Sequence, residues 1–266
     1  MTLGLNGRVA LITGASRGIG YAIAEALRTQ GVRVVLIARD ETALKSAAAN
    51  LPGASEDTVL TLGADVTDTE SVREAVTKAH SWGGRLDIVV NSAGPQLTPA
   101  PLTDTPTEQL AEYLDAKLLG FHRVASAALP LLNDSGSGRI INVAGATALT
   151  LVPNAGVTGI TNAAILAFNN YLASEAAARN VLVNAVSPGM TLTEGWTARH
   201  EAMGKAQGKS GDEVRNGMTA AIGIRIGRWA EPAEIANAVV FLASDLATYV
   251  TGSVLEVDGG ISKAVL

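Results

Sequence analysis

A glycine-rich segment near the start of the chain has residue types and spacing that suit the binding of a phosphate anion. It reads Thr13-Gly14-Ala15-Ser16-Arg17-Gly18-Ile19-Gly20 and follows a short apolar run. Glycines permit a tight turn and a close approach of the backbone to a pyrophosphate, and a helix that begins here would offer its free N–H groups to the anion. The segment therefore predicts a dinucleotide-binding turn. Its candidate contacts are Gly14, Ser16, Arg17, Gly18, Ile19 and Gly20.

The elements that must position this turn alternate along the chain. Short β-branched runs are separated by longer Ala-rich segments of helical period, which is the pattern of βαβ units. The strands are expected at 8–13, 32–38, 59–63, 86–91, 139–144, 181–186 and 254–257, and the helices at 18–30, 41–50, 70–82, 107–132, 156–179 and 232–243. Right-handed crossovers then give an α/β fold of Rossmann type, a doubly wound parallel sheet of seven strands with helices on both faces.

No repeat or linker divides the sequence, so residues 1–266 are expected to form a single dinucleotide-binding domain. Residues 191–228 are rich in glycine and charge and follow a late strand. We interpret them as an irregular, mobile flap over the ligand site, with a merely variable surface loop as the alternative. Glu194, Trp196 and Met203 are its candidate substrate contacts.

Composition excludes several classes of function. The net charge is −5 with no long run of like charges, which argues against a nucleic-acid partner and against a basic membrane surface. The chain has no cysteine, and its three histidines are scattered without metal-ligand spacing, so no metal site is expected and the histidines are interpreted as ordinary surface residues. With no apolar stretch long enough to span a membrane, we expect a cytoplasmic protein that acts on a small molecule.

Five motifs in order make the chain resemble the short-chain dehydrogenase/reductase family. After the glycine-rich turn come Asp65-Val66, Asn91-Ser92-Ala93-Gly94 and Ser187-Pro188-Gly189, and the sequence ends with Thr251-Gly252 and Val257-Asp258-Gly259-Gly260. The resemblance implies a single-domain Rossmann-type fold, NAD or NADP as cofactor, and a homo-oligomer, either a dimer or a tetramer.

The same resemblance assigns further contacts to the cofactor. It implies that Asp65 and Val66 flank the adenine. The ribose side would be lined by Asn91, Ala93 and Gly94, and the carboxamide would be approached by Pro188, Gly189 and Thr193. Each of these residues could instead be an ordinary turn residue.

Charge at the end of the second expected strand favours NADP(H) over NAD(H). NAD enzymes of this fold place an acidic side chain there to bind the ribose diol, whereas this chain has Arg39 at that point and Arg17 in the glycine-rich turn. Two guanidinium groups suit the 2′-phosphate of NADP(H). In the alternative, both arginines are solvated surface charges and Asp40 supplies the acid.

The catalytic positions depart from the family pattern. Members of the family usually carry an Asn, a Ser and a Tyr-x-x-x-Lys motif, and alignment on the neighbouring residues places Lys117, Gly145, Thr158 and Asn162 at those four positions. Glycine has no donor and a threonine hydroxyl is a far weaker acid than a phenol, so ordinary carbonyl reduction should be crippled.

Lysine and asparagine have in effect exchanged places. We hypothesise that Lys117 is an active-site cation, while Asn162 still bonds a ribose hydroxyl; in the alternative, Lys117 reaches solvent at a helix end. The candidate catalytic residues are Lys117, Thr158 and Asn162, and Thr147 and Asn154 are candidate polar groups of the pocket. A literal Tyr-x-x-x-Lys at Tyr113 is interpreted as coincidence.

Three functions remain open. The first is an NADP(H)-dependent oxidoreductase that passes a hydride to an activated acceptor, such as an iminium, a quinone-like ring or a polarised enone. The second is a redox-silent NADP(H)-binding pseudoenzyme or partner subunit. The third is a non-redox cyclase, isomerase or lyase on the same fold.

Overall fold

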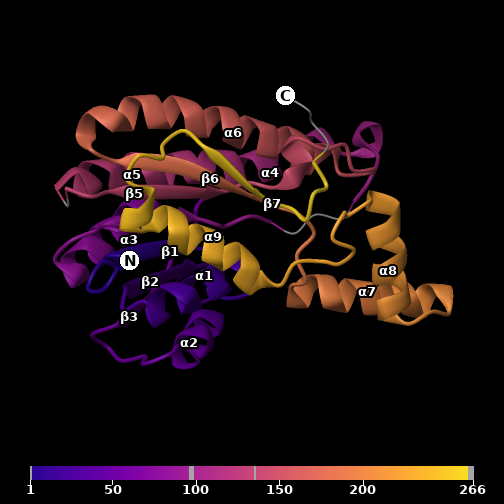
Figure 1. Ribbon diagram of the computed structural model, residues 1–266, viewed down its shortest axis with the longest axis horizontal. Helices are drawn as coiled ribbons and strands as arrows, with labels where there is room; N and C mark the ends of the chain where they lie inside the picture. Colours follow the sequence, from indigo (N-terminus) through magenta and orange to yellow (C-terminus); the bar gives the residue numbers. More distant parts are fainter. Residues whose placement is uncertain (1, 96–98, 135, 263–266) are drawn as a thin grey trace.

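Seven parallel strands form one sheet in the computed structural model, which describes residues 2–95, 99–134 and 136–262. Their order is β3-β2-β1-β4-β5-β6-β7, so the direction of winding reverses between β1 and β4 (Figure 1). The strands are β1 (Val9–Thr13), β2 (Arg33–Ala38), β3 (Val59–Gly63), β4 (Ile88–Asn91), β5 (Arg139–Val143), β6 (Leu182–Pro188) and β7 (Val254–Val257). The expected Rossmann-type sheet is confirmed.

Helices cover both faces of this sheet. The α-helices of the described residues are α1 (Gly18–Thr29), α2 (Glu41–Ala49), α3 (Thr69–Gly83), α4 (Thr107–Leu114), α5 (Gly120–Asp134), α6 (Gly156–Ala176), α7 (Glu194–Gln207), α8 (Gly211–Ile222) and α9 (Pro232–Ala243). One core contains buried residues of α1, α2 and α9, and a second core contains those of α3, α5 and α6. None of the helices among the described residues is long and apolar enough to cross a membrane.

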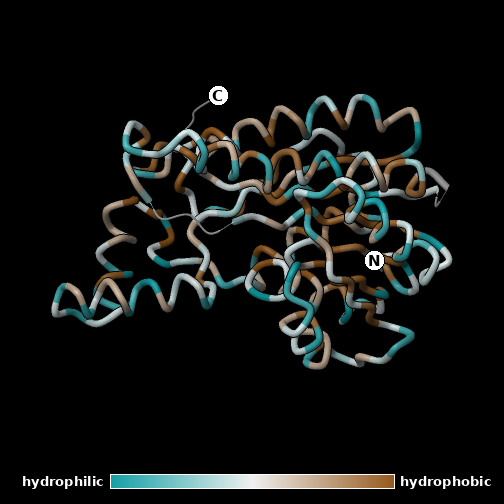
Figure 2. The backbone as a smooth tube through the Cα atoms, turned by 180° about the vertical axis from the view of Figure 1, so that it is seen from behind, coloured by the Kyte–Doolittle hydropathy of each residue, from teal (hydrophilic) through white to brown (hydrophobic). Residues whose placement is uncertain are grey.

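The pleat of the strands explains why their sequences are apolar throughout. In β1, Val9 and Leu11 pack into the α3–α5–α6 core, while Ala10 and Ile12 pack into the α1–α2–α9 core. Successive residues of a strand point to opposite faces, so a sheet covered on both sides needs apolar residues at every position. Figure 2 shows hydrophobic stretches gathered in these central strands.

The helix expected at 107–132 is interrupted. After α4 the chain makes a π-helical turn, η2 (Asp115–Leu119), before α5 begins at Gly120. Such turns arise where an extra residue is accommodated in a helix, and they occur frequently at functional sites. Periodicity alone does not reveal this turn, because the apolar pattern continues through it.

Residues 191–228 are not irregular, so that expectation was wrong. They contain α7 and α8, which lie at one end of the molecule, beyond the carboxyl ends of the strands (Figure 1). Ser210 and Glu213 form a reciprocal capping box at the start of α8, and left-handed glycines at Gly208 and Gly223 end the two helices. Two of the glycines that suggested a loop, Gly208 and Gly223, therefore act as helix terminators.

Candidate functional site

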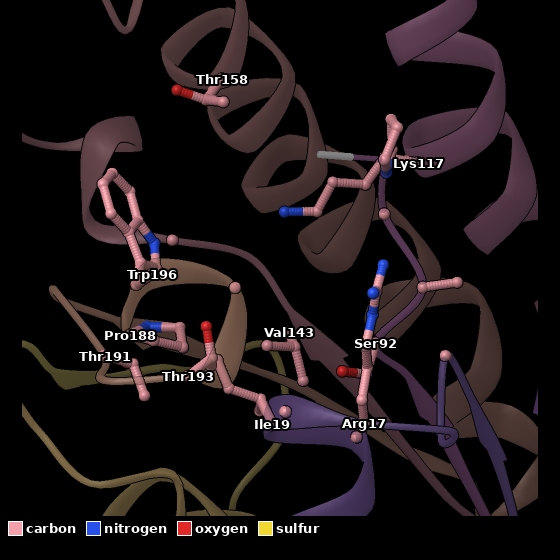
Figure 3. Close-up of a pocket in the computed structure, with 18 of the residues that line it drawn as sticks. Arg17, Ile19, Ser92, Lys117, Val143, Thr158, Pro188, Thr191, Thr193 and Trp196 are labelled. Carbon is pink, nitrogen blue, oxygen red and sulfur yellow. The ribbon is translucent and has the colours of Figure 1, made fainter. Parts of the chain in front are cut away.

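A cavity of about 1160 Å³ opens at the carboxyl ends of the central strands. Residues that follow β1, β2, β3, β4, β5 and β6 line it, and so do residues of α4, α6, α7 and α8. This is the place where open parallel sheets bind their ligands, beside the point where the strand order reverses. Figure 3 shows Lys117 and Trp196 on opposite sides of this space.

Two glycines of the glycine-rich turn, Gly14 and Gly20, have no room for a side chain. Gly14 has a φ of +68°, and a Cβ there would stand 2.8 Å from Cα of Ala93. A Cβ on Gly20 would stand 2.3 Å from the carbonyl oxygen of Gly14, so α1 packs directly on the turn. No side chain caps the N-terminus of α1, whose N–H groups therefore remain available to an anion. These features fit the pyrophosphate of a dinucleotide.

The turn after β4 is tied to this glycine-rich turn. The backbone N–H groups of Ser92 and Ala93 donate to the Thr13 hydroxyl at 3.0 and 3.1 Å, and Ala93 and Gly94 line the cavity. Asn91 does not line it. Its side chain is fully buried and donates to Asn142 across the β4–β5 pair at 3.0 Å, so it braces the sheet instead of facing the expected ribose side.

Both arginines that favoured a phosphorylated cofactor border the cavity. Arg17 and Arg39 are exposed and line it together with Asp65 and Val66. Burial alone would raise the pKa of Asp65, but hydrogen bonds from Thr67 and the nearby Arg39 outweigh it and hold that pKa below its usual value. The Asp65 carboxylate is therefore ionised at neutral pH.

Asp40 caps a helix in this region. Its carboxylate accepts a hydrogen bond from the Ala43 N–H at 3.0 Å and so caps the N-terminus of α2. Although Asp40 borders the cavity, its carboxylate is already held by the helix end.

The turn after β6 approaches β7 closely. Pro188, Gly189 and Thr193 all line the cavity, as the resemblance implied. A Cβ on Gly189 would stand 2.7 Å from backbone atoms of Asp258, so only glycine fits at this position. Thr193 precedes α7, and the cavity wall therefore continues directly into that helix.

Lys117 lies in the π-helical turn with its amine inside the protein. The residue is 9% exposed, and its Nζ donates to the Ala144 carbonyl at 3.1 Å and to Oδ1 of Asn162 at 2.7 Å. Its aliphatic stem packs on the turn after β4, with Cδ 3.4 Å from where a Cβ of Gly94 would stand. The expectation that Lys117 reaches solvent at a helix end does not describe this arrangement.

Burial also changes the acidity of this lysine. Desolvation disfavours the charged amine and lowers the pKa of Lys117 to about 8, and no carboxylate compensates. At pH 7 the amine is mostly protonated, yet it can give up its proton far more readily than an exposed lysine. An ammonium carries three N–H groups, and the two contacts leave one for a ligand.

The other three positions that the motif alignment matched to catalytic residues of the family line the same cavity. Asn162 is buried, and its Nδ2 donates to the Thr147 hydroxyl at 2.8 Å. Gly145 lies against that amide, because a Cβ there would stand 2.6 Å from Nδ2. The Thr158 hydroxyl donates to the Ala155 carbonyl at 2.8 Å. The structure therefore brings Gly145, Thr158 and Asn162 together with Lys117 around one cavity.

Tyr113, one turn before Lys117, also lines the cavity. Burial raises its pKa to about 12, so the phenol stays protonated at neutral pH. The Tyr-x-x-x-Lys spacing was interpreted as a coincidence, yet both Tyr113 and Lys117 border the cavity.

The outer wall comes from α7 and α8. The candidates Glu194, Trp196 and Met203 border the cavity, and so does Asn154. Sequence reasoning missed further lining residues of this outer region, because nothing in their spacing distinguishes them. They include Met190, Arg199, Met218 and Ile222.

His200 is not the surface residue that the sequence suggested. It is 2% exposed, with its ring 5.6 Å from that of Trp196 and 4.6 Å from that of Trp229. Neither ring nitrogen has a hydrogen-bond partner among the described residues, and burial together with Arg215 and Arg199 lowers the pKa of His200. The histidine is thus part of an aromatic cluster that anchors α7.

Known proteins share this architecture along the whole chain. Residues 14–262 match a family model described as enoyl-(acyl carrier protein) reductase. The chain is 36% identical to 3-oxoacyl-(acyl-carrier-protein) reductase FabG of Vibrio cholerae, with 97% of this chain and 99% of that one covered. It is 35% identical to L-fucose dehydrogenase of Bos taurus, with 96% and 89% covered. It also superposes on L-sorbose reductase from Gluconobacter frateurii, complexed with NADPH and L-sorbose, with a TM-score of 0.91, 34% identity and all of both chains covered.

Proposed function

Because the chain belongs to the short-chain dehydrogenase/reductase family of oxidoreductases, we propose that it transfers a hydride from NADPH to an activated acceptor, with Lys117 as the active-site cation. NADPH, when bound, supplies the hydride. The chain's own residues hold the cofactor, exclude water from the cavity and provide the proton that completes the reduction.

The observation that carries this proposal is the position of the Lys117 amine. It is held by two acceptors, the Ala144 carbonyl and Asn162, in a cavity that also contains the glycine-rich turn. Its third N–H can donate to an acceptor that has gained a hydride. In that step the Nζ–H bond breaks, the acceptor gains the proton, and the neutral amine recovers a proton from solvent. A pKa of about 8 suits such an acid at neutral pH.

The acceptor must be activated because the site offers few other groups that could polarise a carbonyl. The hydroxyl of Thr158 is bound to the Ala155 carbonyl, and Gly145 has no side chain. An iminium, a quinone or a polarised enone supplies its own electrophilicity, so that geometry and one cation suffice.

The choice of NADP(H) follows from the two arginines. Arg17 and Arg39 border the cavity, whereas the Asp40 carboxylate is engaged in capping α2. Two cations at this edge of the cavity attract a 2′-phosphate, which carries negative charge. The NADPH complex of L-sorbose reductase supports the same cofactor.

The test is a panel of acceptors offered with NADPH or NADH. We expect oxidation of NADPH, followed at 340 nm, with menadione, 2-cyclohexenone and N-methyl-3,4-dihydroisoquinolinium, and far slower oxidation with plain cyclohexanone. Rapid reduction of cyclohexanone would contradict the activated acceptor. Tight NADPH binding without turnover on any acceptor would point to a redox-silent protein, and product formation without a redox change would point to a cyclase, isomerase or lyase.

We also propose that the chain forms a homo-oligomer through the helical face of α6. Ile160 and Tyr171 lie on that helix and are 44% and 75% exposed. Val124 of α5, by contrast, is buried inside the chain. Light scattering on the wild type and on Tyr171→Glu tests this proposal, because the added charge should dissociate the assembly.

A further inference from the structure

Three side chains form a continuous polar chain along the cavity wall. Nζ of Lys117 donates to Oδ1 of Asn162 at 2.7 Å, and Nδ2 of Asn162 donates to Oγ1 of Thr147 at 2.8 Å. All three residues line the cavity, and the first two are more than nine-tenths buried. The chain leads from the buried cation to a hydroxyl on η3 (Ala146–Ala148).

Chemistry fixes the direction of each bond in this chain. An ammonium can only donate, so the amide oxygen of Asn162 must face Lys117, and the amide nitrogen must face Thr147. The Thr147 oxygen therefore accepts a hydrogen bond. Its own hydrogen has no acceptor among the described residues, so it is available to a ligand in the cavity.

Thr158, the residue at the family's tyrosine position, is different. Its hydroxyl already donates to the Ala155 carbonyl at 2.8 Å in the first turn of α6. Of these two threonines, only Thr147 has an uncommitted donor.

Gly145 explains why the donor stands at Thr147. A Cβ at Gly145 would stand 2.6 Å from Nδ2 of Asn162, so any side chain there would require the Asn162 amide to shift. The glycine leaves the space in which this amide reaches Thr147.

We infer that the Thr147 hydroxyl binds the oxygen of the acceptor and is a further catalytic residue of this site. The inference rests on the proposed function, since it requires an oxygen-bearing acceptor to be reduced in this cavity. Thr147 keeps its proton throughout and only donates a hydrogen bond to the oxygen as negative charge develops there. Each donor in a chain strengthens the next one, so the Lys117 ammonium makes this hydroxyl a better donor than an isolated threonine.

The first experiment compares Thr147→Val with Thr147→Ser. The valine has the same shape without the hydroxyl, and we expect kcat/KM for NADPH-dependent reduction of menadione and 2-cyclohexenone to fall roughly tenfold or more, whereas the serine restores most of it. Thr161→Val is the matched control, because that hydroxyl bonds Val157 within α6 and does not line the cavity. The dissociation constant of NADPH, measured by fluorescence, should stay unchanged in all three variants.

An acceptor without an oxygen provides a second control. N-methyl-3,4-dihydroisoquinolinium offers nothing for the hydroxyl to bind, so its reduction at pH 9 should be the same in Thr147→Val and the wild type. Equal losses on the iminium and on the carbonyl acceptors would overturn the inference, because they would show a general structural defect. Loss of carbonyl reduction in Tyr113→Phe but not in Thr147→Val would also overturn it and assign the oxygen to the phenol.

Binding without turnover separates this inference from the proposed function. With NADP⁺ bound there is no hydride to transfer, and the dissociation constant of 2-cyclohexenone can be measured by calorimetry. We expect weaker binding in Thr147→Val even if the wild type reduces nothing, in which case only the proposed function fails. Equal binding in the variant and the wild type, or no binding to the wild type, would overturn the role of Thr147.

Discussion

Lys117 and Asn162 lie 45 residues apart in the sequence and are joined by a 2.7 Å hydrogen bond. The bond links the π-helical turn between α4 and α5 to the first half of α6. The motif alignment predicts that lysine and asparagine are exchanged between these two positions relative to the family. In the structure the two side chains meet, and one cation borders the cavity.

Replacing Lys117 by methionine should remove the proton donor and leave the cofactor site intact. We expect kcat for menadione with NADPH to fall by roughly 10²-fold, the usual size of a lost general acid, and the NADPH dissociation constant to change less than twofold. Stopped-flow absorbance at 340 nm and fluorescence titration measure the two quantities. Lys78→Met, at an exposed lysine of α3, is the control. Unchanged turnover in Lys117→Met would remove the proposed role.

The lowered pKa of Lys117 predicts opposite pH profiles for two kinds of acceptor. Below pH 8 the amine is protonated, so it can assist a carbonyl but repels a cation; above pH 8 both effects vanish. Reduction of 2-cyclohexenone should therefore decline as the pH rises through about 8, while reduction of the iminium should increase. Profiles of kcat/KM between pH 6 and 10 test this, with Lys117→Met expected to lose both inflections. Parallel profiles for the two acceptors would contradict it.

Burial of this lysine should also make the free energy of unfolding depend on pH. Its pKa is about 8 in the folded chain and 10.5 in an unfolded one, so between these values the unfolded state binds more protons and stability rises with pH. The full effect is roughly 3 kcal/mol. Urea unfolding at pH 7, 8, 9 and 10 should show this rise in the wild type relative to Lys117→Met. If the two free energies of unfolding change in parallel, the amine is not desolvated in solution.

The strands of the sheet were predictable because each is an apolar run whose ends are marked by neighbouring residues in the sequence. The strands at 59–63 and 254–257 were predicted to the residue, since both runs are bounded by turn residues that end a strand. The π-helical turn and the helices α7 and α8 were missed for the opposite reason. The apolar pattern of 107–132 does not change at the extra residue, and the glycines within 191–228 signal loops as readily as helix ends.

Most of the candidate residues named from the sequence line one cavity, but their hydrogen bonds could not be predicted. Motif order identified Lys117, Thr158 and Asn162, and all three line the cavity. The sequence could not show that Asn162 turns its amide nitrogen to Thr147, because that contact depends on the space left by Gly145. Asn91 was assigned to the cofactor from its motif alone, yet its side chain is used inside the sheet.

Reversing the charge of Arg39, which borders the cavity, should change the preferred cofactor. In Arg39→Asp the new carboxylate would repel a 2′-phosphate and could accept hydrogen bonds from a ribose diol. We expect KM for NADPH to rise at least roughly tenfold, since a lost contact with a charged group costs about 1.5–3 kcal/mol, and KM for NADH to fall. Arg179→Asp, at an exposed arginine outside the cavity, should leave both values as they are. An unchanged ratio of the two KM values would show that Arg39 does not contact the phosphate.

The buried histidine of α7 should make the fold sensitive to mild acid. Because the pKa of His200 is lowered on folding, the unfolded chain binds more protons than the folded one near and below pH 6.5, and stability falls as the pH drops through that range. Asp212 opposes this shift, but desolvation of the ring and the charges of Arg215 and Arg199 outweigh it.

His200→Phe removes the titration and two unpaired nitrogens while retaining the contacts with Trp196 and Trp229. Its melting temperature should therefore exceed that of the wild type by more at pH 5.5 than at pH 8, as measured by differential scanning fluorimetry. His122→Phe, at an exposed histidine of α5, is the control. A constant difference between the two pH values would mean that His200 is protonated equally in the folded and unfolded chains.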